Sequence, residues 1–486
     1  MSKKLLLPFI SAIVAATGFV AAPAHASKTQ ESIFQDDRTL IFSGDAKRQA
    51  ALDEMKALGA TTIHSLVFWN TIAPDANTLT KPAGFDGSDP SAYPPGAFDQ
   101  YDALVREATA RGLKLLLSPV EAPAWAGGCG SIVVRHHCEP SASEFGAFVA
   151  ALGKRYSGSF DGLPRVSRWS VWNEPNQASW LYPQRRRIHG HIINTAAMMY
   201  RDLFRAATGA LKATGHGSDQ ILLGETAPLG RTTGSLGNRF LTPVELYQGV
   251  FCLDSRGHRL RGRIAKDSGC SGRYAKLAAS GVSHHPYNRG GSQRPLAKPA
   301  RGEITISTLS RLNAVLAQGS HNRRIKSNLP IYLTEFGFQT NPPDKVFGVS
   351  LSRQAQYLNQ SDYLAYRDSR VKSVAQYELF DEPDLEVFQS GLFLLNGKAK
   401  PSVDAYRLPI WVTRHGSGVT VWGQVRPADG TPQQVVIQNG RRAFKDVKTV
   451  TTRPSGYFQV NVSRQPGSRW RLSWKGFTSR LATAAR

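Results

Sequence analysis

Two glutamates in this 486-residue chain directly follow short apolar runs, and their carboxyl groups could act as acids, bases or nucleophiles. Glu174 follows residues 166–172, and Glu335 follows residues 331–334. Apolar runs of this length indicate buried strands, and Pro175 cannot continue a strand ladder. We therefore expect both carboxylates at the C-terminal ends of strands, where parallel sheets and barrels carry their active sites.

Two carboxyl groups that face each other across a pocket can cleave a glycosidic bond. One donates a proton to the leaving oxygen, and the other attacks the sugar or activates water. Other pairings stay open at this stage, because four more glutamates lie near predicted strand ends: Glu121, Glu225, Glu378 and Glu382.

The elements that would position these groups alternate between short apolar runs and longer amphipathic ones from residue 39 to about residue 408. The predicted strands are residues 39–42, 62–69, 113–117, 166–172, 221–224, 282–284, 331–334 and 371–379. Helices are predicted at 45–58, 98–110, 143–156, 193–214, 304–318 and 352–367. Such alternation predicts βαβ units, and a count of eight favours a closed (β/α)8 barrel over an open sheet. In a barrel, strands four and seven open on the same face.

The pattern changes near residues 408–409, where helical runs stop. Short strands at 419–422, 434–437 and 456–460 are separated by Gly and Pro, which predicts a small β-sandwich. We expect a signal peptide at 1–26, a catalytic (β/α)8 domain at 27–408 and an accessory sandwich at 409–486.

Several motifs together resemble the retaining glycoside hydrolases of clan A, with similarity to families 5 and 39 over roughly residues 39–408. The motifs are Trp172-Asn173-Glu174-Pro175-Asn176, Leu333-Thr334-Glu335-Phe336-Gly337, Ser283-His284-His285-Pro286-Tyr287, Trp69 with Ala73-Pro74, and Ala122-Pro123-Ala124-Trp125.

This resemblance implies roles for individual residues. Glu174 would be the acid/base and Glu335 the nucleophile, with Asn173 bonding the sugar 2-hydroxyl at the cleavage point. His285 would line the same subsite, and Tyr287 would bond the nucleophile. We expect burial and the charge of Glu335 to raise the pKa of Glu174, while Tyr287 helps to keep Glu335 ionised.

The chain departs from the pattern of these hydrolases in two strands. Many relatives carry an arginine in strand two that braces the nucleophile, whereas this chain has His64 there. His64 either substitutes for that arginine or is a hydrogen-bonded core histidine. Strand eight commonly supplies a tryptophan to the sugar platform, and here Tyr377 or Phe380 would have to serve.

Three tryptophans could stack on sugar faces, because an aromatic ring offers apolar area and a polar edge. Trp69, Trp125 and Trp180 each could equally belong to the core, and Trp125 is the strongest candidate for a sugar contact.

The first 26 residues have the pattern of a secretory signal peptide. Two lysines precede an apolar stretch, and Ala24-His25-Ala26 provides a cleavage site, so the mature chain should begin near Ser27. An uncleaved membrane anchor is the alternative, but the run is interrupted by Pro8 and Gly18. No later segment has the roughly 20 apolar residues that a membrane span needs. We expect a secreted protein without a membrane span after cleavage.

The four cysteines fit export. Local pairing, Cys129 with Cys138 and Cys252 with Cys270, is the simplest of three connectivities. Zinc is the alternative because two histidines precede Cys138, but the spacing matches no common zinc signature. We expect neither a metal nor a cofactor.

The formal net charge is +24, which suggests a negatively charged partner. The basic residues are scattered, except for the run at 185–187, and no nucleic-acid motif accompanies them. An anionic cell-wall polymer or acidic polysaccharide is the partner that we expect, and a solvated arginine-rich surface is the alternative.

The sequence thus predicts a secreted retaining glycosidase that acts on a β-linked poly- or oligosaccharide. A carbohydrate- or cell-wall-binding protein with lost or weakened turnover, a structural cell-wall protein and a metal hydrolase are the alternatives. The sugar, its linkage, and endo or exo attack stay open.

Overall fold

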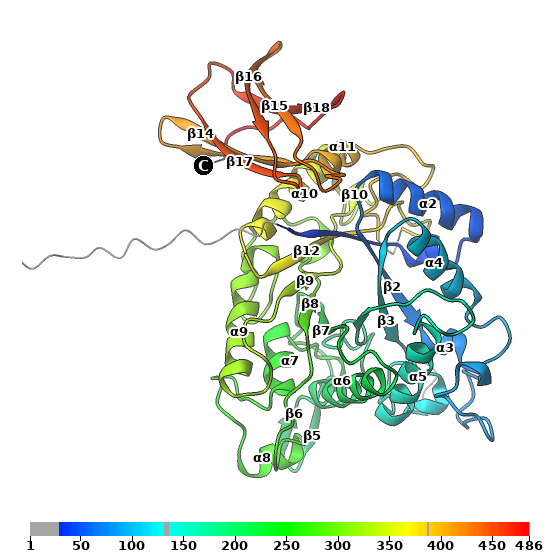
Figure 1. Cartoon of the computed structure of the whole chain (residues 1–486). Helices are drawn as coiled ribbons and strands as arrows, with labels where there is room; N and C mark the ends of the chain where they lie inside the picture. Colours follow the sequence, from blue (N-terminus) through cyan, green and yellow to red (C-terminus); the bar gives the residue numbers. More distant parts are fainter. Residues whose placement is uncertain (1–28, 131–135, 386–387, 486) are drawn as a thin grey trace, which may run out of the picture.

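A computed structural model describes residues 29–130, 136–385 and 388–485 (Figure 1). The predicted signal peptide lies outside the described residues. Within the described part, no helix combines the length and the apolar character that a membrane crossing requires.

Eight parallel strands form a closed barrel, as the sequence predicted. In spatial order they are β1 (Glu31–Gln35), β2 (Thr62–Phe68), β3 (Lys114–Val120), β4 (Arg168–Ser170), β7 (Gln220–Thr226), β8 (Gly281–His284), β9 (Ile331–Leu333) and β12 (Val371–Tyr377). The barrel closes where β1 pairs with β12, with Glu31 opposite Ser373.

The prediction of a first strand at residues 39–42 is wrong. These residues lie in helix α1 (Asp37–Ile41), and the first strand is β1, which comes earlier. The Asp36 side chain accepts a hydrogen bond from the Thr39 amide at 3.0 Å, which caps this helix. A four-residue apolar run suits a strand and a buried helical turn equally, and the cap decides between them.

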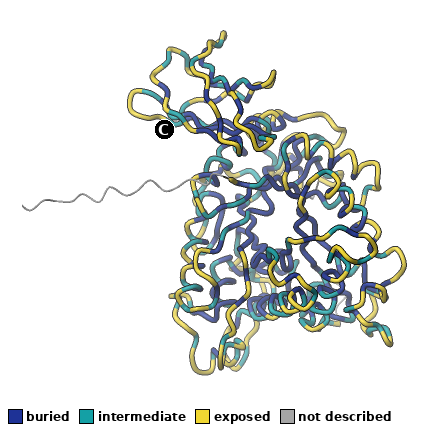
Figure 2. Tube along the Cα trace, in the orientation of Figure 1, coloured by how far each residue is buried: buried dark blue, intermediate teal, exposed yellow. Residues whose placement is uncertain are grey.

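Helices cover the outside of the barrel (Figure 1). The main ones are α2 (Asp45–Ala57), α4 (Asp99–Ala110), α5 (Ala142–Arg155), α6 (Thr195–Ala213), α7 (Pro243–Val250), α9 (Leu309–His321) and α10 (Leu351–Tyr366). Each buries one apolar face; in α6 this face includes Tyr200, Leu203, Phe204, Ala207 and Leu211, spaced three to four residues apart. In Figure 2 the buried trace accordingly follows the strands and the inner sides of the helices.

Shorter helices and strands lie within the loops that connect the main elements. They are α3 (Trp69–Ile72), α8 (Gly262–Asp267), α11 (Ser402–Arg407), the hairpin β5 (Arg186–Ile188) with β6 (His191–Ile193), and the pair β10 (Thr340–Asn341) with β11 (Val349–Ser350). Disulfides Cys129–Cys138 and Cys252–Cys270 close two of these loops, which confirms the predicted pairing.

The C-terminal strands form a separate lobe, orange to red in Figure 1. One antiparallel sheet contains β13 (Ile410–His415), β14 (Gly418–Gln424) and β17 (Tyr457–Val462). The other contains β15 (Gln434–Gly440), β16 (Phe444–Thr451), β18 (Arg469–Trp474) and β19 (Phe477–Thr478). Side chains from both sheets share one core, including Val421, Ile437 and Leu472, which confirms the predicted β-rich C-terminal region.

This lobe is held on helix α10. The Asn359 amide donates to the Ala405 carbonyl at 2.7 Å and its oxygen accepts from the Ile410 amide at 3.1 Å. Asp362 pairs with Arg426 at 3.3 Å. These contacts fix the lobe against the barrel.

Candidate active site

A cavity of about 490 Å³ lies where the barrel strands end. Its wall includes Asp37 after β1, Glu174 after β4, Tyr287 after β8, Glu335 after β9 and Glu378 after β12. The barrel topology therefore brings the two predicted carboxylates into one cavity, since strand ends from all around the barrel meet at this face.

The His285 side chain contacts the carboxylates of both Glu174 and Glu335. Its Nδ1 lies 3.1 Å from Glu174 Oε1 and 3.4 Å from Glu335 Oε2. One oxygen of each carboxylate and the histidine nitrogen all lie within 4.8 Å of one another. The His285 side chain is fully buried, so it supports the carboxylates rather than forming the cavity surface.

A third glutamate, Glu225, completes this cluster and was not singled out from the sequence. Its Oε2 lies 2.6 Å from His285 Nε2 and accepts from the Thr334 hydroxyl at 2.6 Å, while its amide donates to the Ser283 hydroxyl at 2.8 Å. Glu225 is fully buried. Its position at the end of β7 was the only sequence signal, and three other glutamates shared that signal.

The charges of this cluster shift one another's pKa values. Burial would lower the pKa of His285, but the charges of Glu335, Glu174 and Glu225 raise it well above its usual range. Burial would raise the pKa of Glu225, yet His64 and His285 lower it to about 2. His285 is therefore held as a cation against an ionised Glu225.

The pKa of Glu335 is raised by its burial. Burial and the charge of Glu174 together raise the pKa of Glu335 to about 8, while the charge of His285 acts in the opposite direction. This direction differs from the sequence-based expectation that Glu335 stays ionised. The side chain of Glu335 is 9% exposed and that of Glu174 is 16% exposed, so desolvation acts more strongly on Glu335.

Two neighbours occupy the positions that the resemblance implied. The Tyr287 hydroxyl donates to Glu335 Oε2 at 3.3 Å. Asn173 lines the cavity, and its buried Oδ1 has no hydrogen-bond partner within the described part of the chain. An unpaired buried amide oxygen costs free energy, so Asn173 is ready to accept a hydrogen bond from a bound hydroxyl.

Four glutamates at or just after the ends of barrel strands have left-handed backbones. The φ angles are 50° at Glu121, 36° at Glu174, 47° at Glu225 and 79° at Glu378. This region costs a residue with a side chain roughly 1–3 kcal/mol, and such strain concentrates at functional sites. In Glu174 and Glu225 the unusual backbone accompanies side chains that bond the same histidine.

The structure does not bring His64 into the cavity. Its ring nitrogens lie 2.8 Å from the Ser118 hydroxyl and 3.3 Å from the Thr334 carbonyl oxygen inside the barrel. Burial lowers the pKa of His64 to about 4. His64 is thus a neutral, hydrogen-bonded core residue, and its two ring nitrogens contact Ser118 and Thr334 rather than the Glu335 carboxylate that an arginine would brace.

Trp69 and Trp125 lie outside this cavity. Trp69 is 1% exposed and stacks on Phe148 with centroids 5.3 Å apart. Trp125 packs edge-on against Trp69 at 5.7 Å, and its indole donates to the Pro74 carbonyl at 2.9 Å. Each was a candidate for a sugar contact or for the core, and their rings pack with each other and with core aromatics.

Other aromatic rings line the cavity: Phe42, Phe68, Trp180, Tyr287, Phe347, Tyr377 and Phe388. Tyr377 was one of the two candidates for a sugar platform on strand eight, and its ring lies 5.3 Å from that of Phe388. These two rings give the cavity an apolar side wall.

One side of the cavity is acidic. Asp37, Glu378 and Glu382 face it together with Arg38, which pairs with Glu382 at 2.7 Å. Burial raises the pKa of Asp37 to about 7 and that of Glu378 well above its usual range. With the two glutamates of the cluster, the cavity has five carboxyl groups and one guanidinium.

Among the residues that the structure describes, two groups of side chains have donor atoms close enough for a metal ion. Glu174, His285 and Glu335 form one, and Cys129, Cys138 and Glu139 form the other. In the second group both sulfurs are joined in a disulfide. In the first, Glu335 and Glu174 raise the pKa of His285 well above its usual range, and a metal would have to compete with a proton for its nitrogen. Neither donor set fits a metal well.

No protein-family model and no curated protein matches this chain. Solved structures with a similar course of the chain include a GH30 endoxylanase from Clostridium papyrosolvens, 10% identical, with 95% of each chain covered and a TM-score of 0.46. A GH5_18 protein from Streptomyces cattleya in complex with GlcNAc is 15% identical, with 78% of this chain and 79% of that chain covered and a TM-score of 0.47. A GH1 β-glucosidase from Humicola insolens is 13% identical, with 78% and 98% covered and a TM-score of 0.47.

Proposed function

We propose that this protein is a retaining glycoside hydrolase of clan A that cleaves a β-linked poly- or oligosaccharide. The observation that carries the proposal is the pairing of Glu174 with Glu335. One oxygen of each carboxylate lies within 4.8 Å of the other, in a cavity that opens at the strand ends. Retaining enzymes keep their two carboxyl groups about 5–5.5 Å apart, whereas inverting enzymes need about 6.5–9.5 Å to admit water.

In the first step Glu335 attacks the anomeric carbon and Glu174 gives a proton to the leaving oxygen. A covalent glycosyl-enzyme forms, and the alcohol leaves. In the second step Glu174 takes a proton from water, which displaces Glu335 from the sugar. Asn173 accepts a hydrogen bond from the sugar 2-hydroxyl, and this contact tightens in the transition state.

The raised pKa of Glu335 adds a step before attack. Burial raises the pKa of Glu335 to about 8 in the free protein, and the nucleophile must be ionised before it attacks. His285 Nδ1 lies within 3.4 Å of both carboxylates, so it can pass a proton from Glu335 to Glu174 as a sugar displaces water. This transfer leaves Glu335 ionised, as a nucleophile must be, and Glu174 protonated, as the acid must be.

The remaining parts of the proposal concern location and organisation. We propose secretion, which two disulfides in the described chain support because such bonds persist in oxidising compartments. Residues 27–408 would be the catalytic domain, and residues 409–486 an accessory sandwich. A basic surface would favour an anionic cell-wall polymer as a further partner.

The test uses an aryl β-glycoside with a good leaving group. For the wild type, NMR of the first-formed sugar should show the β-anomer, because two displacements retain configuration. Glu174→Ala should lose most turnover, and azide should restore part of it by forming a β-glycosyl azide. An α-anomer as the first product would refute double displacement. Sugar binding without any release would favour the alternative of a carbohydrate-binding protein.

A further inference from the structure

A second cavity, on the outer flank of the barrel, is lined by arginines. It measures about 590 Å³ and lies between the loop closed by Cys252–Cys270 and the residues after α9. Five arginines line it: Arg259, Arg261, Arg273, Arg323 and Arg324. Within the described part of the chain, no aspartate or glutamate is among its lining residues.

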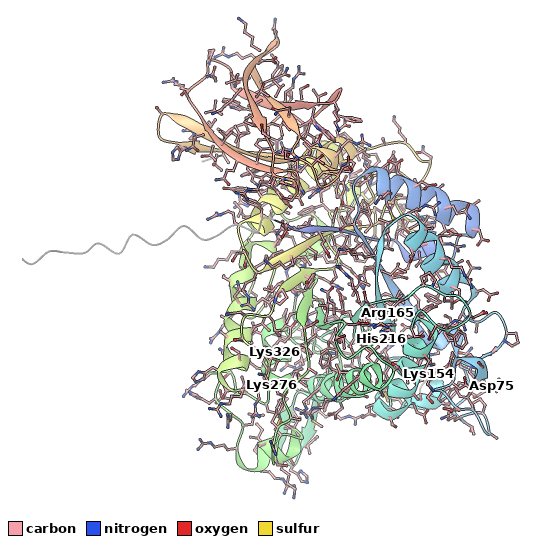
Figure 3. All side chains as sticks on the ribbon, viewed as in Figure 1. Asp75, Lys154, Arg165, His216, Lys276 and Lys326 are labelled. Atoms are coloured by element: carbon pink, nitrogen blue, oxygen red, sulfur yellow. A yellow bond between two sulfur atoms is a disulfide. The ribbon has the colours of Figure 1, made fainter. Side chains whose placement is uncertain are left out.

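The two segments that form this cavity are bonded to each other. The Leu277 amide donates to the Arg324 carbonyl at 2.9 Å. Lys276 and Lys326, labelled in Figure 3, belong to the same two segments and mark this flank of the barrel. The cavity is therefore a defined feature of the fold, and positive charge extends to its surroundings.

Tyr274 stacks on the guanidinium of Arg324, which lines the cavity, and on that of the neighbouring Arg205, which does not. Its ring centroid lies 4.1 Å from Cζ of Arg324 and 4.9 Å from Cζ of Arg205. The Tyr274 hydroxyl donates to the Val250 carbonyl at 2.8 Å, which fixes the ring. A guanidinium group that stacks on a ring keeps its N–H edges free to bind anions. Its side-chain conformation is already fixed before an anion binds.

The charge in this cavity is uncompensated. The buried Nε atoms of Arg205 and Arg324 have no hydrogen-bond partner among the described residues. Burial lowers the pKa of Arg324, and the charge of Arg259 lowers it further. The nearby Asp202 pairs with Arg205 only at 3.8 Å and does not line the cavity. Because arginine does not lose its proton, an anion is the remaining way to neutralise this site.

The basic run at residues 185–187 behaves differently. Arg185 pairs with Glu245 at 3.0 Å and Arg186 with Glu139 at 2.5 Å, while Arg187 donates to the Gly190 carbonyl at 2.9 Å. The run is thus largely satisfied by the protein. The five arginines that line the flank cavity, by contrast, form no ion pair with an acidic side chain among the described residues.

We propose that this cavity binds the anionic groups of an acidic polysaccharide, apart from the active site. Carboxylate or sulfate groups along such a chain match the paired oxygens that guanidinium recognises. A cavity of this volume lies in the range that holds a ligand of one or a few sugar units. Binding here would keep the protein on an acidic glycan while the active site works.

The test measures binding of the full-length protein to sodium polygalacturonate, with neutral dextran as reference and inorganic sulfate as competitor. Wild type should bind polygalacturonate and not dextran, and binding should weaken as salt rises because exposed charges are screened. The double variant R259A/R273A removes two exposed side chains and should weaken binding on the order of tenfold.

The matched control is R441A/R442A, which removes two exposed arginines between β15 and β16. It lowers the net charge equally and should leave binding unchanged. Equal weakening in both variants would mean that net charge alone attracts the polymer, and the proposal would fail. It would also fail if sulfate bound alone as tightly as the polymer, or if wild type did not bind. None of these readouts depends on turnover, so the proposed hydrolase activity stands or falls separately.

Discussion

The two cavities are similar in size and opposite in charge. Counting the described residues, the active-site cavity of about 490 Å³ has five carboxyl groups and one guanidinium, and the flank cavity of about 590 Å³ has five guanidinium groups and no carboxylate. Buried carboxyl groups can take up protons, and raised pKa values at Glu335 and Asp37 show that they do. Arginines cannot give their protons up.

This difference teaches what each cavity can be used for. Carboxyl groups with raised pKa values can gain and lose protons near neutral pH. A bound sugar can therefore change which carboxyl group carries a proton, and acid–base catalysis needs such transfers. The arginines present a permanent charge, which suits steady attraction of an anion. The charge of the active-site cavity can change by protonation, whereas the charge of the flank cavity can be neutralised only by a bound anion.

The largest expected effect separates the two cavities by catalysis. Glu335→Ala should lower kcat on an activated aryl glycoside by on the order of 10⁴-fold or more, because the group that forms the covalent bond is lost. Arg324→Ala should leave that kcat unchanged, since the arginine lies in the flank cavity. Initial rates with both purified variants test this, with melting curves to verify folding. Wild-type turnover in Glu335→Ala would overturn the assignment of the nucleophile.

A second prediction tests the positioning role of Glu225, which bonds His285 from the side away from Glu174. Glu225→Gln keeps the shape but removes the charge that holds His285 as a cation. We expect kcat/KM to fall about 10²-fold or more, by analogy with the carboxylate that orients a catalytic histidine. The pH dependence should also change, because the pKa of His285 falls.

The control for this prediction is Glu121→Gln. Glu121 also follows a barrel strand with a left-handed backbone, but it accepts from Asn70 at 2.9 Å and does not line the cavity. Its substitution should leave the pH profile unchanged. If both variants behaved alike, the histidine contact of Glu225 would have no special importance.

Much of the active site could be predicted because barrel topology does the positioning. Strand-end placement puts Glu174 and Glu335 on one face of the barrel, and the resemblance to clan A hydrolases implied Tyr287. Glu225 could not be ranked, since its role depends on a 2.6 Å contact to His285 that no spacing encodes. The raised pKa of Glu335 depends on its burial, which arises only when the loops pack.

The predictions for Trp69 and Trp125 show another limit. A tryptophan near a strand end can face the cavity or the helices, and a rotation of the local backbone decides which. Here Phe148 of α5 supplies a stacking partner, and the rings face the core. The flank cavity was equally hidden, because its arginines come from segments as far apart as residues 259 and 324. Only the folded chain brings such positions together.

The smallest expected effect concerns stability and sharpens the contrast in protonation. Burial raises the folded pKa of Glu335 to about 8, above its ordinary value of 4.5. A raised carboxyl pKa stabilises the folded state fully below about pH 4.5, and this contribution is lost as the pH rises through about 8. Glu335→Gln mimics the protonated form at every pH. Near pH 4.5 the variant should therefore have the same melting temperature as the wild type. Near pH 9 its melting temperature should be higher than that of the wild type by on the order of 1–2 °C. Asp404→Asn, at an exposed position on α11, should show no such trend. Equal melting temperatures of Glu335→Gln and wild type at both pH values would mean that Glu335 is ionised in the free protein, and the proton transfer through His285 would then have no starting point.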